Sequence, residues 1–396
     1  MTYRTLDQAE LAGRRALVRV DFNLPMNEGK VTDDTRLRAA LPTLERLRAA
    51  GAKTILLSHF DRPKGRRVAG MSLAPIARAL QEILGQRVGF VDDCVGAPLA
   101  AAVAAMAPGD VVLLENLRFH KGEEANDPLF ADALARNGDL YVNDAFSTAH
   151  RAHASTEGLA HLLPAFAGEA MRRELDALDA ALGSPAHPVL GVVGGSKVST
   201  KLDLLNNLVL KLDSLAIGGG MANTFLFAAG VDVADSFCEK DLAGTAREIM
   251  ASAKAAGCEV LLPIDVVVAR RLEAGVDHHT RALDAIRPGE RILDAGPKTI
   301  ERLVKAMDGA RTLIWNGPLG VFETPPFDRA TTEAARHAGG LVRAGRLVAV
   351  AGGGDTGAAL NHAGAAGDFT FVSTAGGAFL EWMEGKTLPG VAALQH

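Results

Sequence analysis

The stretch that decides the fold is Val189-Leu190-Gly191-Val192-Val193-Gly194-Gly195-Ser196-Lys197, residues 189–197. Its first five residues are continuously apolar, which is typical of strands buried on both faces, as in parallel sheets. A glycine turn and the helical stretch 201–211 follow. Such a turn exposes backbone N–H groups at a helix N-terminus, where phosphate binds. The stretch therefore predicts an α/β fold with an anion site.

The same pattern recurs along the chain. Further apolar runs predict strands at Ala16–Val20, Thr54–Leu57, Val111–Leu114, Leu140–Val142, Leu215–Ile217, Val260–Leu262, Thr312–Trp315, Leu347–Val350 and Phe369–Val372. Between many of them lie alanine- and leucine-rich stretches of helical length, at Leu37–Ala50, Leu73–Leu84, Leu129–Arg136, Lys201–Lys211 and Thr331–Ala338. Strand alternating with helix implies parallel sheets with right-handed crossovers.

A length of 396 residues favours two domains. The best boundary is residues 168–188, where a charged helix over Glu169–Leu182 is followed by Gly183-Ser184-Pro185-Ala186-His187-Pro188. We therefore predict an α/β protein with two lobes, each a mostly parallel sheet with helices on both faces, Rossmann-like and joined by a helical hinge. The expected domains are residues 1–170 and 171–379.

Composition excludes several classes of protein. Hydrophobic residues make up 48% and charged residues 22%, so the chain is globular, and a net charge of −5 gives nucleic acid no general attraction. Cys94, Cys238 and Cys258 are isolated, which argues against disulfides and a structural zinc site. There is no apolar run of membrane-spanning length and no signal peptide, so we expect a cytoplasmic protein without membrane contact.

In the first half of the chain, polar and charged residues end or follow the predicted strands. They are Arg19, Asp21, Asn23, His59, Arg62, Arg118, His150, Arg151 and His153, with Arg36 nearby. Parallel pairing brings strand ends to one edge of a sheet, and converging guanidinium groups suit phosphate or carboxylate. The alternative is a scatter of solvated arginines, with His59 half-buried and Asp21 and Asn23 capping a turn.

In the second half, runs of glycine follow the strands. Lys197 and Lys201 lie one helical turn apart after Gly194-Gly195, but the spacing of a Walker A loop is absent. The alternative is a packing turn with an exposed lysine pair. Trp315 to Glu323 offers a carboxylate for ribose hydroxyls and an apolar wall, Pro318 and Val321, for adenine; it could equally be a structural turn.

Gly352-Gly353-Gly354-Asp355-Thr356-Gly357 formally matches the dinucleotide fingerprint G-x-G-x-x-G. That interpretation needs an acidic residue at the end of the next strand, whereas Asp368 precedes it. Asp355 at a helix start is either an N-cap or, beside a polyphosphate, a ligand for Mg²⁺.

Taken in order, these segments resemble the phosphoglycerate kinase family from residue 15 to residue 390. The resemblance lies in Arg19–Asn23, Asp33–Arg36, Ser58-His59 with Arg62-Pro63, Glu115–Phe119, Val142–Phe146, His150–His153, Gly194-Gly195 with Lys197-Val198, Gly218–Ala222, Trp315–Glu323, Gly352–Asp355 and Leu388–Gly390. Eleven motifs in this order are specific, although no single one is.

The resemblance implies reversible phosphoryl transfer from 1,3-bisphosphoglycerate to MgADP, giving 3-phosphoglycerate and MgATP, by a monomer whose lobes close over both substrates. It assigns the phosphoglycerate to Asp21, Asn23, Arg36, His59, Arg62, Arg118 and Arg151. It assigns the nucleotide to Gly195, Lys197, Lys201, Gly220, Asn316, Pro318, Gly320, Val321, Glu323, Gly352, Gly353, Gly354, Asp355 and Thr356. It assigns catalysis to Arg36 and Lys197 and the binding of Mg²⁺ to Asp355. It also implies that residues 380–396 pack back on the first lobe.

Several positions depart from the family pattern. They are Phe60-Asp61, Ser147, Ser196 and Ser373 to Phe379, and none removes a charged group. Two other functions are weighed: an NAD-dependent dehydrogenase, which rests on the glycine fingerprint alone, and a non-catalytic nucleotide-binding protein, which would not need the arginines.

Overall fold

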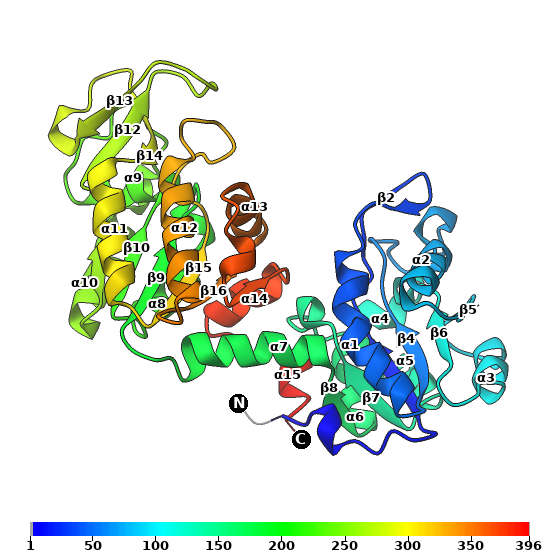
Figure 1. Cartoon of the computed structure of the whole chain (residues 1–396). Helices are drawn as coiled ribbons and strands as arrows, with labels where there is room; N and C mark the ends of the chain where they lie inside the picture. Colours follow the sequence, from blue (N-terminus) through cyan, green and yellow to red (C-terminus); the bar gives the residue numbers. More distant parts are fainter. Residues whose placement is uncertain (1–2, 396) are drawn as a thin grey trace. The chain divides into compact units, whose positions relative to one another are not determined.

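The computed structural model describes residues 3–395 (Figure 1). The chain divides into two compact units. The N-terminal unit comprises the residues up to 175 together with those from 387 on, and the C-terminal unit comprises residues 176–386. Both contain parallel sheets and helices, which confirms the predicted fold class. The division falls inside helix α7 (Glu169–Leu178), and the domain limits expected at residues 170 and 379 stay predictions.

The N-terminal unit is built on a parallel sheet with the strand order β5-β6-β4-β1-β7-β8. Its strands are β1 (Arg15–Arg19), β4 (Lys53–Leu57), β5 (Val88–Val91), β6 (Val111–Leu114), β7 (Leu140–Asn143) and β8 (Ala165–Ala167), with a hairpin of β2 (Met26–Asn27) and β3 (Lys30–Val31). Its helices are α1 (Thr35–Ala49), α2 (Ala74–Leu84), α3 (Ala97–Ala104), α4 (Lys121–Glu124), α5 (Pro128–Ala135), α6 (Leu159–Leu162) and α15 (Pro389–Ala392).

The continuous apolar runs have a physical reason in this sheet. Val18 of β1 packs in a core with Leu44 of α1 and Leu80 of α2. Leu17, which points to the opposite face of the strand, is also fully buried. Burial of a large apolar side chain contributes about 1.5–3 kcal/mol, so apolar residues on both faces stabilise the central strands.

The C-terminal unit is built on a second parallel sheet, with the order β11-β10-β9-β15-β16-β17. Its strands are β9 (Val189–Val193), β10 (Ser214–Ile217), β11 (Glu259–Leu261), β15 (Thr312–Asn316), β16 (Val348–Gly352) and β17 (Phe371–Ser373). Its helices are α8 (Leu202–Leu208), α9 (Gly219–Ala228), α10 (Ala243–Ala256), α11 (Pro297–Gly309), α12 (Arg329–Arg343), α13 (Gly354–His362) and α14 (Gly377–Met383).

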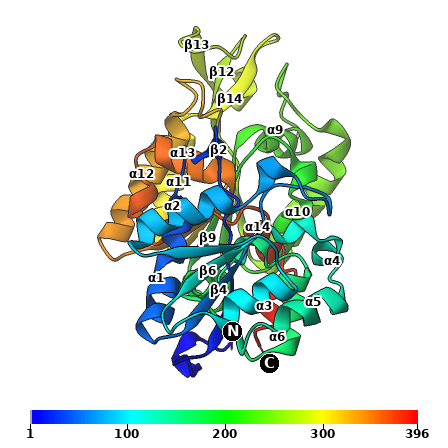
Figure 2. The same cartoon turned by 90° about the vertical axis from the view of Figure 1, so that its right-hand side faces the viewer.

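An antiparallel sheet accompanies it, formed by β12 (Asp265–Ala269), β13 (His278–Ala282) and β14 (Arg291–Ala295) in the order β13-β12-β14 (Figure 2). The sequence analysis does not predict this sheet, nor the strands β5 and β8. The C-terminal helix α15 belongs to the N-terminal unit, where Gly390 N–H donates to the Ala149 carbonyl at 2.8 Å. No helix within residues 3–395 is long and apolar enough to cross a membrane.

Candidate active site

The polar tails of the N-terminal unit meet because their strands run parallel. The last residue of β1, Arg19, pairs in register with Leu57 of β4 on one side and with Asn143 of β7 on the other. The residues that follow these strands therefore share one edge of the sheet, as the sequence predicts. Ligands of open α/β sheets bind at this kind of edge.

Asp21, Asn23 and Arg36 form one group at this edge. Arg36, near the start of α1, places Nη1 2.9 Å from Asp21 Oδ2 and donates to the Asn23 carbonyl at 2.8 Å. The amide oxygen of Asn23 accepts from the Asp61 N–H at 2.9 Å. Asp21 also accepts from its own turn, at the Asn23 N–H. The sequence left two alternatives for Asp21 and Asn23, namely capping a turn or belonging to a cluster with the arginines. In the structure they do both.

His59 lies at the centre of the positive charge. Its side chain is buried, and burial lowers the pKa of the imidazole well below its usual value. The charges of Arg19, Arg118, Arg151 and Arg36, in this order, lower that pKa further. Since a buried imidazole among guanidinium groups stays neutral, His59 can act on a ligand as a hydrogen-bond partner and not as a charge.

Arg118 and Arg151 are held close by. Arg118 follows β6, is 3% exposed and donates through Nη1 to the Asp61 carbonyl at 2.7 Å. Burial lowers the pKa of its guanidinium. Arg151 is half-buried and donates to His150 Nε2 at 3.2 Å. Both therefore add positive charge beside His59.

Arg62 and Arg19 differ from the rest of the predicted set. Arg62 is exposed on a loop, and among residues 3–395 it has no hydrogen bond or ion pair, so its guanidinium group is not held by another side chain. Arg19 is 1% exposed and lies beneath the edge. Sequence position alone cannot separate a buried arginine from one that faces solvent.

In the C-terminal unit, two glycine turns touch. A Cβ atom on Gly194, after β9, would lie 1.9 Å from the Pro318 carbonyl oxygen, after β15. A Cβ atom on Gly317 would lie 2.3 Å from the Gly194 carbonyl oxygen, and Gly317 also has a φ of +99°. Only glycine permits this approach and this conformation.

Three of the predicted nucleotide residues hold these turns together. Lys201 Nζ donates to the Gly194 carbonyl and to Asn316 Oδ1, each at 2.6 Å. Burial lowers the pKa of Lys201 to about 8, an effect that the charge of Asp355 opposes. Asn316 Nδ2 donates to the Gly352 carbonyl at 2.8 Å, and Thr356 Oγ1 accepts from the Gly317 N–H at 2.7 Å.

The glycine turns border a cavity of about 580 Å³. Its lining includes the predicted residues Gly195, Gly220, Pro318, Gly320, Val321, Glu323 and Asp355. It also includes Gly219, from the motif Gly218–Ala222, and residues that were not predicted from the sequence, namely Asn223, Asp235, Phe237, Leu272, Arg291, Ile292 and Leu293. Several of these residues come from β14 and from loops beside the antiparallel sheet. Because that sheet was not predicted from the sequence, its contribution to the cavity was not predicted either. Phe237 is a half-exposed aromatic residue of that set, and an aromatic residue is the kind of sequence feature that could have pointed to this site.

Lys197 and the glycines of α13 complete the predicted set. Lys197 is exposed directly before the turn Val198–Thr200. Gly353 is the N-cap of α13, which leaves Asp355 in the first turn of that helix. Gly352 is buried against Phe379, whereas Gly354 has open space around it. Of these residues, Asp355 alone lines the cavity.

Asp355 suits a magnesium ion that arrives with a polyphosphate. Its carboxylate is exposed and lines the cavity beside Gly195 and Gly219. Mg²⁺ is commonly held by one or two carboxylates together with phosphate oxygens, and it prefers oxygen ligands. An exposed carboxylate in a glycine-lined cavity fits this requirement.

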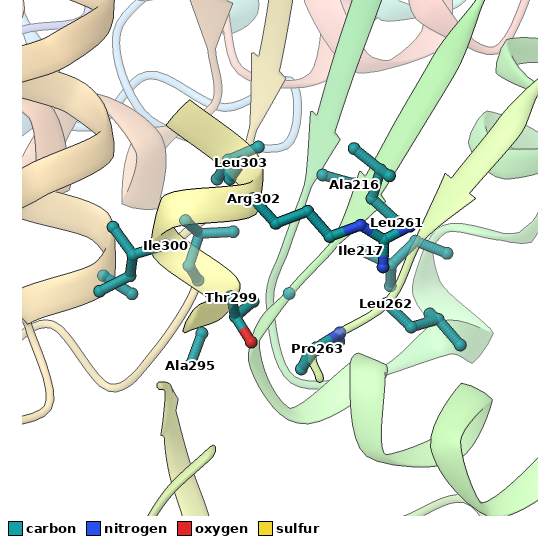
Figure 3. Close-up of a pocket in the computed structure, with 13 residues that line it drawn as sticks. Ala216, Ile217, Leu261, Leu262, Pro263, Ala295, Thr299, Ile300, Arg302 and Leu303 are labelled. Atoms are coloured by element: carbon teal, nitrogen blue, oxygen red, sulfur yellow. The ribbon is translucent and has the colours of Figure 1, made fainter. Parts of the chain in front are cut away.

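Two other features, a small pocket and a group of potential metal ligands, are weaker candidates for a binding site than this cavity. An apolar pocket between α11 and the strands β10 and β11 has a volume of about 20 Å³, roughly one water molecule (Figure 3). In the N-terminal unit the potential metal ligands Asp93, Cys94 and His120 lie within 4.8 Å of one another. His120 Nε2 is already 2.8 Å from Asp93 Oδ1, and Cys94 Sγ already donates to the Glu115 carbonyl.

These features define a two-domain α/β protein that binds anions of two kinds, as a phosphotransferase must. The family model for phosphoglycerate kinase matches residues 6–386. The chain is 69% identical to the phosphoglycerate kinase of Caulobacter vibrioides strain NA1000 and 61% identical to that of Rhizobium meliloti strain 1021, over 100% of each chain in both cases. It belongs to the phosphoglycerate kinase family, whose members are kinases with a carboxyl group as acceptor.

Solved structures agree with this assignment. The chain matches the phosphoglycerate kinase of Coxiella burnetii with a TM-score of 0.93, at 40% identity and over 99% of each chain. It matches that of Pyrococcus horikoshii with a TM-score of 0.81 at 30% identity, over 99% of this chain and 98% of the other. The resemblance drawn from the eleven motifs is confirmed, and the dehydrogenase and non-catalytic alternatives receive no support.

Proposed function

We propose that the chain transfers a phosphoryl group reversibly from 1,3-bisphosphoglycerate to MgADP, giving 3-phosphoglycerate and MgATP. The observation that carries this proposal is the difference between its two sites. A sheet edge with buried and half-buried arginines suits a small discrete acid, whereas a glycine-bordered cavity with the exposed carboxylate of Asp355 suits a metal-bound polyphosphate.

The sheet edge of the N-terminal unit binds the phosphoglycerate. Its ligands are Asp21, Asn23, Arg36, His59, Arg62, Arg118 and Arg151. The guanidinium groups pair with phosphate and carboxylate oxygens, and the neutral His59 supplies a hydrogen bond. Asp21, which holds Arg36 at 2.9 Å, is also available to a hydroxyl group of the sugar acid.

The cavity of the C-terminal unit binds the nucleotide. A volume of about 580 Å³ lies in the range of sites for small ligands. Pro318 and Val321 contact the base, Glu323 accepts from the ribose, and Gly195 and Gly220, which line the cavity without side chains, leave room for the phosphates. Asp355 holds Mg²⁺, which, when bound, neutralises charge on the phosphate oxygens.

The reaction requires stabilisation of charge more than proton transfer. The acceptor carboxylate is ionised at neutral pH because carboxyl groups have pKa values near about 4, so it needs no general base. Arg36, Lys197 and the N–H groups of Gly352 to Gly354 stabilise the phosphoryl oxygens during in-line transfer. Direct transfer also requires the two substrates to meet, and we propose that the units close over them and exclude water.

The direct test is ATP consumption that depends on 3-phosphoglycerate and Mg²⁺. We expect turnover only when all three are present, and ATP hydrolysis without 3-phosphoglycerate would contradict the proposal. Small-angle scattering tests closure separately: the radius of gyration should fall with both substrates bound, and an unchanged radius would exclude closure.

A further inference from the structure

A buried chain of polar side chains lies beneath the sheet edge of the N-terminal unit. It runs from Glu123 through Ser155 and Arg19 to His59. Glu123 is 0% exposed and Arg19 is 1% exposed, so neither faces solvent. The proposed phosphoryl transfer gives neither of them a role. Because buried charges are costly unless they are paired, their retention here needs a reason.

Each of the three guanidinium nitrogens of Arg19 has a defined partner. Its Nε donates to Ser155 Oγ at 2.8 Å, and its Nη1 donates to the Val20 carbonyl. Its Nη2 lies 3.1 Å from His59 Nδ1. A guanidinium group has five N–H donors and no acceptor. In this contact Nδ1 must therefore be the acceptor, with its lone pair toward Arg19.

The far end of the chain keeps Arg19 in place. Ser155 Oγ donates to Glu123 Oε1 at 2.5 Å, and the Ser155 N–H donates to Glu123 Oε2 at 3.0 Å. The serine hydroxyl therefore donates its hydrogen bond to Glu123 and accepts the hydrogen bond from Arg19 through a lone pair. Tyr141 fixes the same residue by donating to the Ser155 carbonyl at 2.8 Å.

The surrounding charges favour the same state of His59. Arg19, Arg118, Arg151 and Arg36 all disfavour the imidazolium form. The facing carboxylate, Asp21, has Oδ1 4.0 Å from Nδ1, which is too far for a hydrogen bond. A neutral imidazole that accepts at Nδ1 carries its proton on Nε2. Among residues 3–395, His59 Nε2 has no hydrogen-bond partner.

We propose that Arg19 is a positioning residue that fixes His59 as the neutral Nε2–H tautomer, so that His59 presents one N–H donor to the anion bound at this edge. Arg19 itself does not contact the ligand. This inference rests on the proposed function for the identity of the anion, but the tautomer is a property of the free protein.

The tautomer is measured by NMR of the full chain labelled with ¹⁵N-histidine, with the His59 signals assigned through His59→Gln. We expect a protonated Nε2 and an unprotonated Nδ1 at neutral pH, without substrate. A proton on Nδ1, or a doubly protonated ring, would overturn the proposal. Neither result depends on activity, so failure here is distinct from failure of the proposed function.

The role of Arg19 is tested with Arg19→Lys, which keeps the charge but cannot hold Ser155, the Val20 carbonyl and His59 together. We expect mixed tautomers and a KM for 3-phosphoglycerate raised in proportion to the loss of the Nε2–H form, from about twofold for an even mixture up to about 10- to 100-fold when the hydrogen bond is lost, with the KM for ATP unchanged. Arg15→Lys at the other end of β1, where Arg15 pairs with Asp139 at 2.6 Å, is the control and should change neither.

Two variants of His59 identify the nitrogen that matters. Glutamine carries its amide nitrogen near the position of Nε2, whereas asparagine reaches only the position of Nδ1. We expect His59→Gln to retain more affinity for 3-phosphoglycerate than His59→Asn. Equal losses, or a wild-type tautomer ratio in Arg19→Lys, would show that Arg19 does not act through His59.

Discussion

The hydroxyl of Thr356 accepts a hydrogen bond from the buried N–H of Gly317 at 2.7 Å, which joins the first turn of α13 to the turn after β15. Both segments border the proposed nucleotide site. The contact also explains how a glycine with a φ of +99° keeps one conformation, since its N–H is held from outside its own turn.

Thr356→Val tests this contact. The substitution keeps the side-chain shape but leaves the Gly317 N–H buried without an acceptor, so we expect a loss of about 1–3 kcal/mol in unfolding free energy and weaker nucleotide binding. Both tryptophans, Trp315 and Trp382, lie in the C-terminal unit and report its unfolding by fluorescence. Thr332→Val is the matched control, because the Thr332 hydroxyl has no hydrogen-bond partner among the described residues; an equal loss in the control would refute the interpretation.

Arg36→Ala tests the proposed catalytic arginine. We expect kcat to fall by about 10²-fold or more, since one preorganised cation at the phosphoryl group is lost, while the Kd for MgADP stays within about twofold. Steady-state kinetics and titration calorimetry measure the two quantities. Arg38→Ala is the control, because Arg38 lies on the same helix and pairs with Asp34 at 2.8 Å. An unchanged kcat in Arg36→Ala would remove Arg36 from the catalytic role.

Asp355→Asn tests the proposed metal ligand. We expect the Kd for MgADP to rise by about tenfold or more, which corresponds to about 1.4 kcal/mol, and the Kd for metal-free ADP to stay constant or fall. Calorimetry with Mg²⁺ and with a chelator separates the two. The control is Asp308→Asn, an exposed carboxylate that pairs with His337. Equal weakening with and without the metal would mean that Asp355 acts on the nucleotide directly.

Much of the fold and the charged edge could be predicted from the sequence. Parallel strands buried on both faces must be apolar throughout, and their carboxyl ends must align, so the strand pattern alone places Asp21 and Asn23 at one edge of a sheet. The sheet of β12 to β14 was not predicted: β12 (Asp265–Ala269) carries a buried apolar run that was missed, whereas β13 (His278–Ala282) is mostly exposed and has no apolar pattern. Phe237 and Arg291, which line the cavity near that sheet, were missed for the same reason.

The burial of individual charged side chains was the second feature that could not be predicted from the sequence. Arg19 ends β1, Arg118 follows β6, and both are almost fully buried, yet Arg118 donates to the Asp61 carbonyl whereas Arg19 donates to Ser155, a residue 136 positions away. Lys201 resembles a phosphate ligand in sequence but donates to two turns of its own unit. Such roles depend on long-range contacts that no local pattern encodes.

Stability of the C-terminal unit should depend on pH through Asp294. This carboxyl group, 2% exposed, accepts from the N–H groups of Ala330 and Ala295 at 3.0 and 2.9 Å. Burial raises its pKa from 3.8 to about 8. Between these values the unfolded chain has released the proton and the folded chain has kept it, so unfolding free energy falls as pH rises from about 4 to about 8 and levels off above. One such group contributes a slope of at most about 1.4 kcal/mol per pH unit.

Asp294→Asn removes this titration, while its amide oxygen can still accept from one of the two N–H groups. We expect tryptophan-monitored urea unfolding to show a smaller pH slope in this variant than in the wild-type chain, with the two curves closest at acid pH and most separated near about pH 8. Asp284→Asn, an exposed carboxyl group of the same unit, should leave the slope unchanged. Burial also raises the pKa of Asp144 to about 7, but Asp144 lies in the N-terminal unit, which the tryptophans do not report. Parallel curves for the wild type and Asp294→Asn would show that Asp294 is ionised in the folded protein throughout this range.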